Sequence, residues 1–287
     1  MIKLRLNPKL SQKLSYFALL FATIIAIIPV VAIIFIIIIN GISTINFEFL
    51  TSMPKNGMRS GGIFPAIVGT FAITMFTIII SLPIGIFAAI YLNEYAKDNN
   101  MFTNLIKLGI VNLATIPSIV YGLFGFYVFV VLMKFGVSII SGALTLSIME
   151  LPVIITTSCN ALKNVPYSFR EASWALGVSK WKTIMYIVLP NAVPSIMTGT
   201  ILSIARISGE TAPILFTAAV FYVPHLPKSV FDQIMTLPYH LYILSTQIPN
   251  VSNDIIFGTA LVLLIMVLTI SFIAIFIRIY FRKHKKW

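Results

Sequence analysis

Two residues of opposite charge, Arg206 and Glu210, lie in the stretch ARISGETAP within an otherwise largely apolar run. They are four positions apart, a spacing that places side chains on one helical face, where a guanidinium and a carboxylate neutralise each other. Gly209 and Pro213 lie around the glutamate, and proline removes the N–H that would bond the carbonyl four residues earlier. A charge pair beside a weak point in the backbone predicts a site that opens as an anion passes, with Thr211 as a further contact.

A permanent structural ion pair is the alternative interpretation of Arg206 and Glu210, because buried pairs are often only structural. The choice depends on the medium around them. Ionisable groups at mid-membrane are costly, so they usually face a bundle interior or a water-filled path and have a partner.

The composition of the 287 residues indicates whether the chain lies in water or in a membrane. Hydrophobic residues make up 59% of the chain and charged residues only 10%, whereas soluble domains carry about 25% charged residues. The mean hydropathy is +0.99. The chain is therefore predicted to be an all-α integral membrane protein. The net charge of +12 comes from basic residues dispersed at the ends of apolar runs, which does not favour nucleic acid binding.

Six windows are apolar enough to cross the hydrocarbon core as helices. They are 17–39, 66–92, 109–133, 137–158, 191–222 and 255–280. Fifteen of the 20 lysines and arginines then fall on one side and four on the other, with Arg206 inside a span. The positive-inside rule places both termini in the cytoplasm, in the cell membrane.

The windows divide the chain into segments. The first span is too long for the apolar region of a signal peptide, so we expect it to be a retained anchor. The segments are a cytoplasmic tail (1–16), the first span (17–39), an extracytoplasmic loop (40–65), a five-helix domain (66–280) with a cytoplasmic loop (159–190) and an extracytoplasmic loop (223–254), and a basic tail (281–287).

The stretch SFREASWALGVSKWK (168–182) is too polar for either neighbouring span. Ser168 and Glu171 have the spacing of a helix capping box, and Gly177 is suited to the left-handed residue that ends a helix. Ser179 would cap a second short helix. The predicted pair of helices carries on its exposed sides Arg170, Lys180 and Lys182. Such an element favours a docking surface for a partner.

Several kinds of chemistry have no motif in this sequence. It contains no phosphate loop, no zinc-protease motif and no nucleophile elbow, and its three histidines are far apart. One cysteine, Cys159, excludes an internal disulfide and a cysteine metal cluster. We therefore expect a transport subunit without catalytic residues, metal or cofactor of its own.

The cytoplasmic loop resembles the membrane-spanning subunits of type I ATP-binding-cassette (ABC) importers. Their motif of E-A-A, three residues, G, nine residues and I-x-L-P is matched in spacing by Glu171, Ala172, Ser173, Gly177, Ile187, Leu189 and Pro190. The resemblance implies a type I importer transmembrane fold in which these residues, with Arg170, couple the chain to an ATPase subunit. The alternative is that Glu171 only caps its own helix.

Further stretches are similar to the phosphate-transport permeases of that family. They are GGIFPAIVGT (61–70), PIGIFAAIYLNEYA (83–96), IPSIVYGLFG (116–125), ALKNVPYSFREASWALG (161–177) and SIARISGETAPILFTAA (203–219). The family's intramembrane charged pair corresponds to Arg206 and Glu210. The resemblance implies a second, homologous permease chain, two ATPase subunits that bind ATP and Mg, and an extracytoplasmic phosphate-binding protein.

One departure from the family concerns the segment after the proline of the fourth span. Thr156 and Cys159 stand where the family has an arginine and a glutamate, and Glu150 is an additional acidic residue. We expect import of inorganic phosphate, driven by ATP hydrolysis in a partner. The alternatives are the same architecture importing sulfate or molybdate, and an ion-coupled secondary transporter.

Overall fold

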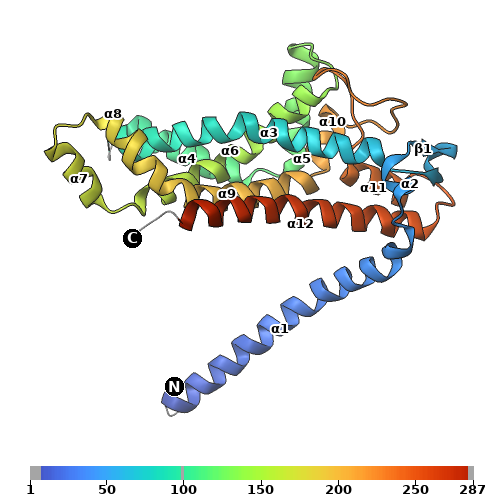
Figure 1. Cartoon of the computed structure of the whole chain (residues 1–287), viewed down its shortest axis with the longest axis horizontal. Coiled ribbons are helices and arrows are strands. Elements are labelled where there is room, and N and C mark those ends of the chain that lie inside the picture. Colours follow the sequence, from blue (N-terminus) through green and yellow to red (C-terminus); the bar gives the residue numbers. More distant parts are fainter. Residues whose placement is uncertain (1–7, 98–99, 284–287) are drawn as a thin grey trace, which may run out of the picture.

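The computed structural model describes residues 8–97 and 100–283. The first seven residues of the predicted tail 1–16 and the last four of the predicted tail 281–287 lie outside the described residues. The described chain is a bundle of helices with one small hairpin of strands (Figure 1). The prediction of an all-α membrane protein is confirmed.

Five long helices form the frame of the molecule. They are α1 (Pro8–Gly41), α3 (Phe64–Ile90), α6 (Ile139–Lys163), α9 (Leu189–Gly209) and α12 (Asn253–Lys283). All five belong to segments long and apolar enough to cross a membrane, and the bent pair α4 (Met101–Thr115) and α5 (Ser118–Gly125) makes a sixth crossing when it is taken as one broken span. The six predicted windows therefore correspond to five continuous candidate spans and one broken pair.

Shorter elements lie mostly at the two ends of the bundle. They are α2 (Phe47–Thr51), α7 (Tyr167–Ala175), α8 (Lys180–Thr183), α10 (Ala212–Thr217), α11 (Leu237–Thr246) and the antiparallel strands β1 (Pro54–Lys55) and β2 (Ser60–Gly61). Tight 3₁₀ turns span Ile42–Thr44 and Asn56–Met58, and wide π-helical turns span Tyr91–Tyr95, Phe126–Leu132 and Ile184–Val188. The helices α7 and α8 mark one end of the bundle, and α11 and the hairpin mark the other (Figure 1).

The bundle is centred on α6. It packs against α3 and α9, and α9 packs in turn against α12. Two thirds (67%) of the membrane-crossing window of α6 is buried within the chain, compared with 17% for α12 and none for α1. Figure 1 shows α1 leaving the bundle near the α11 end, where Gly41 contacts the backbone of Phe257.

The third and fifth predicted windows are wrong as continuous helices, and a proline lies at or shortly after each break. The residue before a proline is disfavoured in the α region, and Ile116, which precedes Pro117, is extended at φ −70° and ψ 131°. The axis then turns by 104° into α5. The window 191–222 ends as a helix at Gly209, and a new short helix, α10, begins just before Pro213.

Close packing between α3 and the loop before α11 depends on a residue without a side chain. A Cβ atom at Gly69 would collide with the backbone carbonyl oxygen of Met235. Gly109 in α4 is also helical, but a Cβ there would have no neighbour within 4 Å. Replacement by alanine should therefore lower the stability of the protein at Gly69 but not at Gly109.

We predict that Gly69→Ala destabilises the protein by about 1 to 3 kcal/mol, because backbone must move to relieve the overlap. Gly109→Ala is the matched control and should leave stability unchanged or raise it by up to about 1 kcal/mol through helix propensity. The check is the thermal midpoint of both purified variants in detergent. Equal midpoints for the two variants would contradict the packing described for Gly69.

Candidate translocation and coupling sites

Arg206 lies in the last turn of α9 and contacts two carboxylates. Its Nε atom is 3.3 Å from Oε1 of Glu150 and 3.4 Å from Oε1 of Glu210. The predicted pair of Arg206 and Glu210 is therefore present, but it is part of a three-membered cluster. The guanidinium side chain is 44% exposed within this single chain, so a molecule approaching from outside the bundle can reach it.

Glu150 is the member of the cluster whose partner the sequence did not reveal. It lies in the middle of α6 and its side chain is 0% exposed. Neither carboxylate oxygen has a hydrogen-bond partner among the described residues, so the contact with Arg206 acts through charge. The sequence did contain a signal for this contact: an acidic residue in an apolar span needs a cation nearby, which predicts a basic partner for Glu150.

Glu210 differs from Glu150 in its backbone setting. It is the residue that ends α9, with φ −70° and ψ 135°, and its side chain is 16% exposed. The expected common helical face therefore does not exist, and the contact with Arg206 spans a helix end. Thr211 follows and is half-buried at the start of α10. A side chain at a break between helices can move without disrupting a ladder of helical hydrogen bonds.

The chemistry available to this cluster follows from its charges. One guanidinium faces two carboxylates, both through Nε, so a carboxylate that moves away leaves more positive charge available to an anion. A guanidinium presents several N–H donors in a plane and suits oxyanions well. Of the two carboxylates, Glu210 is the one whose position permits exchange.

Arg170 forms a second, separate arginine–glutamate centre at the α7 end. Its Nη2 atom is 2.6 Å from Oε1 of Glu94, and both side chains are only 6% exposed. Nη1 and Nη2 also donate to the carbonyl oxygens of Val165 and Leu162, at 3.0 and 3.1 Å. The prediction that Arg170 is exposed is wrong, because the guanidinium joins α7 to the ends of α3 and α6.

Further contacts hold the segment between α7 and α8 in place. The hydroxyls of Ser173 and Thr183 are 2.8 Å apart and buried. Lys180 donates to the backbone carbonyl of Glu94, and its ammonium lies 4.8 Å from the centroid of the Tyr95 ring. Much of the predicted coupling segment is thus anchored to the π-helical turn after α3.

Gly177 adopts the left-handed conformation that the sequence predicts, with φ +73°. A side chain there would meet nothing within 4 Å, so glycine is required by the backbone alone. The predicted capping box is wrong: α7 begins at Tyr167, directly after Pro166, and has no side-chain cap. Pro166 itself is the N-cap residue, with φ −53° and ψ 136°.

The second predicted short helix is also different in the structure. Ser179 stands at the N-cap position of α8 without a side-chain cap, and the helix continues through the π-helical turn into α9, from Lys180 to Gly209. Leu189 and Pro190 lie at the start of α9, half-buried and exposed respectively. The predicted loop 159–190 therefore consists largely of helix, and α7 is its separate element.

The outer face of α7 is exposed. Glu171, Ala172 and Trp174 are accessible, and the rings of Tyr167 and Trp174 meet edge to face at 5.9 Å between centroids. The opposite face carries the buried Arg170 and Ser173. One side of this helix is thus fixed to the bundle while the other presents a carboxylate and two aromatic rings.

Comparison with known proteins agrees with this architecture. Residues 81–286 match the family model described as binding-protein-dependent transport system inner membrane component. The chain is 38% identical over 285 residues to the probable ABC transporter permease protein YqgI of Bacillus subtilis, covering 94% of this chain and 95% of that one.

Two phosphate permeases are similar over most of their length. The phosphate transport system permease protein PstA of Haemophilus influenzae is 33% identical, covering 98% of this chain and 95% of its own. PstA 1 of Mycobacterium tuberculosis (strain CDC 1551 / Oshkosh) is 35% identical, covering 89% of this chain and 84% of its own.

Solved structures with the same fold include two ABC transporters. A bacterial alginate ABC transporter, solved in complex with a periplasmic protein, matches with a TM-score of 0.68 at 17% identity, covering 94% of this chain and 96% of its own. An inward-facing MetNI methionine transporter matches with a TM-score of 0.60 at 17% identity, covering 77% of this chain and 94% of its own. The chain belongs to the family of binding-protein-dependent transport system inner membrane components, the permease subunits of ABC transporters.

Proposed function

We propose that this chain is a permease subunit that imports inorganic phosphate using ATP hydrolysed by partner subunits. The assignment of phosphate as the substrate is supported by the similarity to PstA permeases over 89 to 98% of the chain. Arg206 supports it chemically, because an accessible guanidinium in an apolar span suits a small oxyanion. The chain pairs with a homologous permease, two ATPase subunits and an extracytoplasmic phosphate-binding protein.

The proposed orientation places α7 and both termini in the cytoplasm. The excess of lysine and arginine at that end supports it. The exposed face of α7, with Glu171, Ala172 and the left-handed Gly177 at its end, then docks on an ATPase subunit. Arg170 holds α7 to the membrane domain through its bond to the carbonyl oxygen of Leu162. Leu189 and Pro190 lie at the start of α9, where the coupling segment joins the membrane domain.

The proposed path for phosphate passes Arg206. Glu210 occupies the guanidinium in the resting state and yields to the anion, because it lies at a break between α9 and α10. Glu150 stays buried and keeps the arginine in place. Thr211 adds a hydroxyl beside the break.

The first test is reconstitution of the whole importer in vesicles. We expect uptake of radioactive phosphate that requires ATP and the binding protein and that tenfold sulfate or molybdate does not reduce. The isolated chain should hydrolyse no ATP. Uptake of sulfate or molybdate in place of phosphate would refute the substrate, and uptake driven by an ion gradient without the ATPase subunits would refute the transport class.

The second test separates a path role for Arg206 from a structural one. Arg206→Gln alone leaves Glu150 buried without its cation, which typically costs about 3 to 5 kcal/mol. We therefore use Glu150→Gln/Arg206→Gln, which should assemble normally and yet lose phosphate uptake at least roughly tenfold. The measurements are uptake and complex recovery on the same samples.

Glu210→Gln is the matched variant for this second test. It should assemble and retain phosphate entry, with slower turnover because Arg206 holds the anion longer. If the double variant of Glu150 and Arg206 transports at the normal rate, the cluster is structural and Arg206 does not lie on the path.

The third test concerns the turn after α7. A β-branched side chain resists the left-handed conformation by roughly 1 to 2 kcal/mol, whereas asparagine tolerates it. Gly177→Val should uncouple ATP hydrolysis from phosphate uptake in an assembled complex, and Gly177→Asn should behave like the original chain. Normal coupling in an assembled Gly177→Val complex would argue against a coupling role for this turn.

A further inference from the structure

The corner between α4 and α5 takes from one backbone carbonyl the donor that a continuous helix would give it. In a helix the carbonyl of Leu113 accepts from the N–H of the residue four positions later, which is Pro117 and has no N–H. The axis turns by 104° at this point. A carbonyl without a donor is costly in an apolar span, so another group is expected to replace the missing N–H.

The hydroxyl of Tyr121 supplies that donor. It donates across the corner to the carbonyl oxygen of Leu113 at 2.7 Å. The backbone N–H of Ile116 donates to the same oxygen at 3.3 Å, which is longer than the usual N–H···O distance of about 2.9 to 3.0 Å. Tyr121 is only 4% exposed. The phenol is therefore the shorter of the two bonds that close the corner, and it comes from an enclosed side chain.

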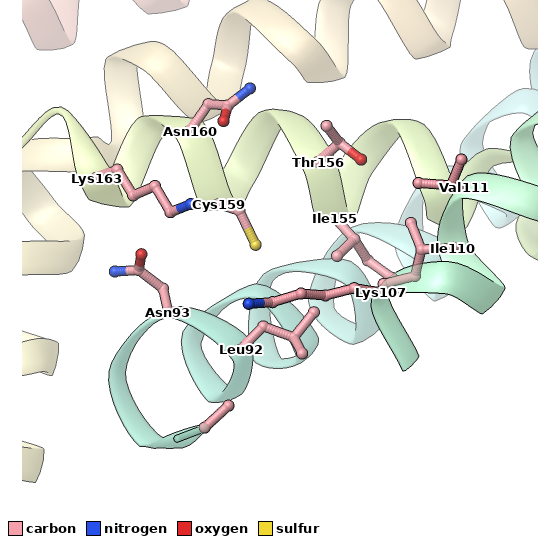
Figure 2. Close-up of a pocket in the computed structure, with 11 residues that line it drawn as sticks. Leu92, Asn93, Lys107, Ile110, Val111, Ile155, Thr156, Cys159, Asn160 and Lys163 are labelled. Atoms are coloured by element: carbon pink, nitrogen blue, oxygen red, sulfur yellow. The ribbon is translucent and has the colours of Figure 1, made fainter. Parts of the chain in front are cut away.

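Helix α4 is itself placed against α6. Figure 2 shows Ile110 and Val111 of α4 beside Ile155 of α6, where these residues line a pocket of about 340 Å³ together with the turn after α3. Leu113 follows directly and packs against the buried cluster that contains Tyr121. The Tyr121 hydroxyl thus ties α5 to a segment that α6 already positions.

Helix α5 also touches the first residues of α10. A Cβ atom at Gly122 would lie 2.9 Å from the carbonyl oxygen of Ala212 and 3.0 Å from Cα of Pro213. The two backbones are therefore too close for a side chain between them. Ala212 is two positions after Glu210, at which α9 ends. The residue next to Tyr121 thus contacts the segment that begins just after this break.

The ring of Tyr121 lies close to the Arg206 cluster. It belongs to a buried apolar cluster that includes Ile207 of α9 and Met149 of α6. These two residues are the neighbours in sequence of Arg206 and Glu150. The same two charged residues act electrostatically on the Tyr121 hydroxyl. One side chain therefore closes the corner with its hydroxyl and packs beside the charged residues with its ring.

We propose that Tyr121 is a positioning residue for the Arg206 cluster. Its hydroxyl fixes the corner and keeps α5 against the start of α10, which places the backbone at Glu210 and Thr211. Tyr121 does not contact the anion in this role. The inference rests on the proposed function, in which phosphate passes Arg206.

The first measurement concerns the corner alone. Tyr121→Phe removes the hydroxyl and keeps the ring. Spin labels are placed on cysteines at Leu108 of α4 and Leu123 of α5, both exposed, in an assembled importer in which Cys159 and any cysteines of the partners are replaced. Pulsed electron paramagnetic resonance then gives the distribution of distances between the labels.

We expect Tyr121→Phe to broaden this distribution and to add a second, shifted distance. Tyr127→Phe is the matched control, because Tyr127 is 64% exposed in the turn that follows α5, and it should leave the distribution unchanged. The measurement needs no transported substrate, so its outcome is independent of whether the importer carries phosphate or of whether Arg206 lies on the path.

The second measurement is phosphate uptake per assembled complex in vesicles. Tyr121→Phe should lower it at least roughly fivefold, because small misplacements of a positioned group are costly, and Tyr127→Phe should not. A merely structural role predicts that less complex is recovered while uptake per complex stays normal. An unchanged distance distribution, normal uptake per complex, or failure of Tyr121→Phe to assemble would each overturn the proposal.

Discussion

The organisation of this protein depends on the neutralisation of buried carboxylates by arginine. Glu150 sits fully buried in an apolar span, and Glu94 is nearly as inaccessible at the end of another. Taking such charges out of water is costly unless a partner lies close. Arg206 and Arg170 supply those partners, so α6, α9, α7 and the end of α3 have defined positions relative to one another.

The second constraint is that backbone groups in a membrane need partners within the protein. Continuous helices meet it, and the breaks in this chain occur where proline already removes a donor. Pro117 and Pro213 each interrupt a predicted span, and the short helices α5 and α10 that follow pack against each other. The charged cluster around Arg206 lies beside the second break, and Glu210 is the residue at which α9 ends.

Local features of the sequence were predictable, and features that join distant segments were not. The left-handed Gly177 follows from a short-range pattern, and the apolar windows indicate the spans. The contact of Arg206 with Glu210 is present as predicted, although it spans a helix end and not one helical face. The partner of Arg170 is 76 positions away, and no spacing rule reaches that far. Its guanidinium was expected on the surface because a basic side chain in a polar segment usually lies there.

The interruption of two spans was missed for a related reason. Hydropathy averages over a window, and the windows 109–133 and 191–222 remain apolar across their breaks. The prolines were visible in the sequence, but proline within a membrane helix is compatible with a kink as well as an end. Pro152 and Pro194 stay inside α6 and α9 without ending them, so the outcome at each proline depends on tertiary packing.

Helix α6 connects the two arginine centres physically. Glu150 in its middle holds Arg206, and the carbonyl of Leu162 near its end accepts a hydrogen bond from Arg170. These residues are separated by roughly 18 Å of helix at 1.5 Å per residue, in the most buried span of the described chain. A displacement of α7 that preserves the Arg170 contacts must therefore carry the end of α6 with it. A helix transmits such a displacement along its axis because its hydrogen bonds resist stretching, and Glu150 lies on that axis. The geometry thus joins α7 to the charge cluster through α6, which continues past Pro152, and Glu210 lies where α9 ends.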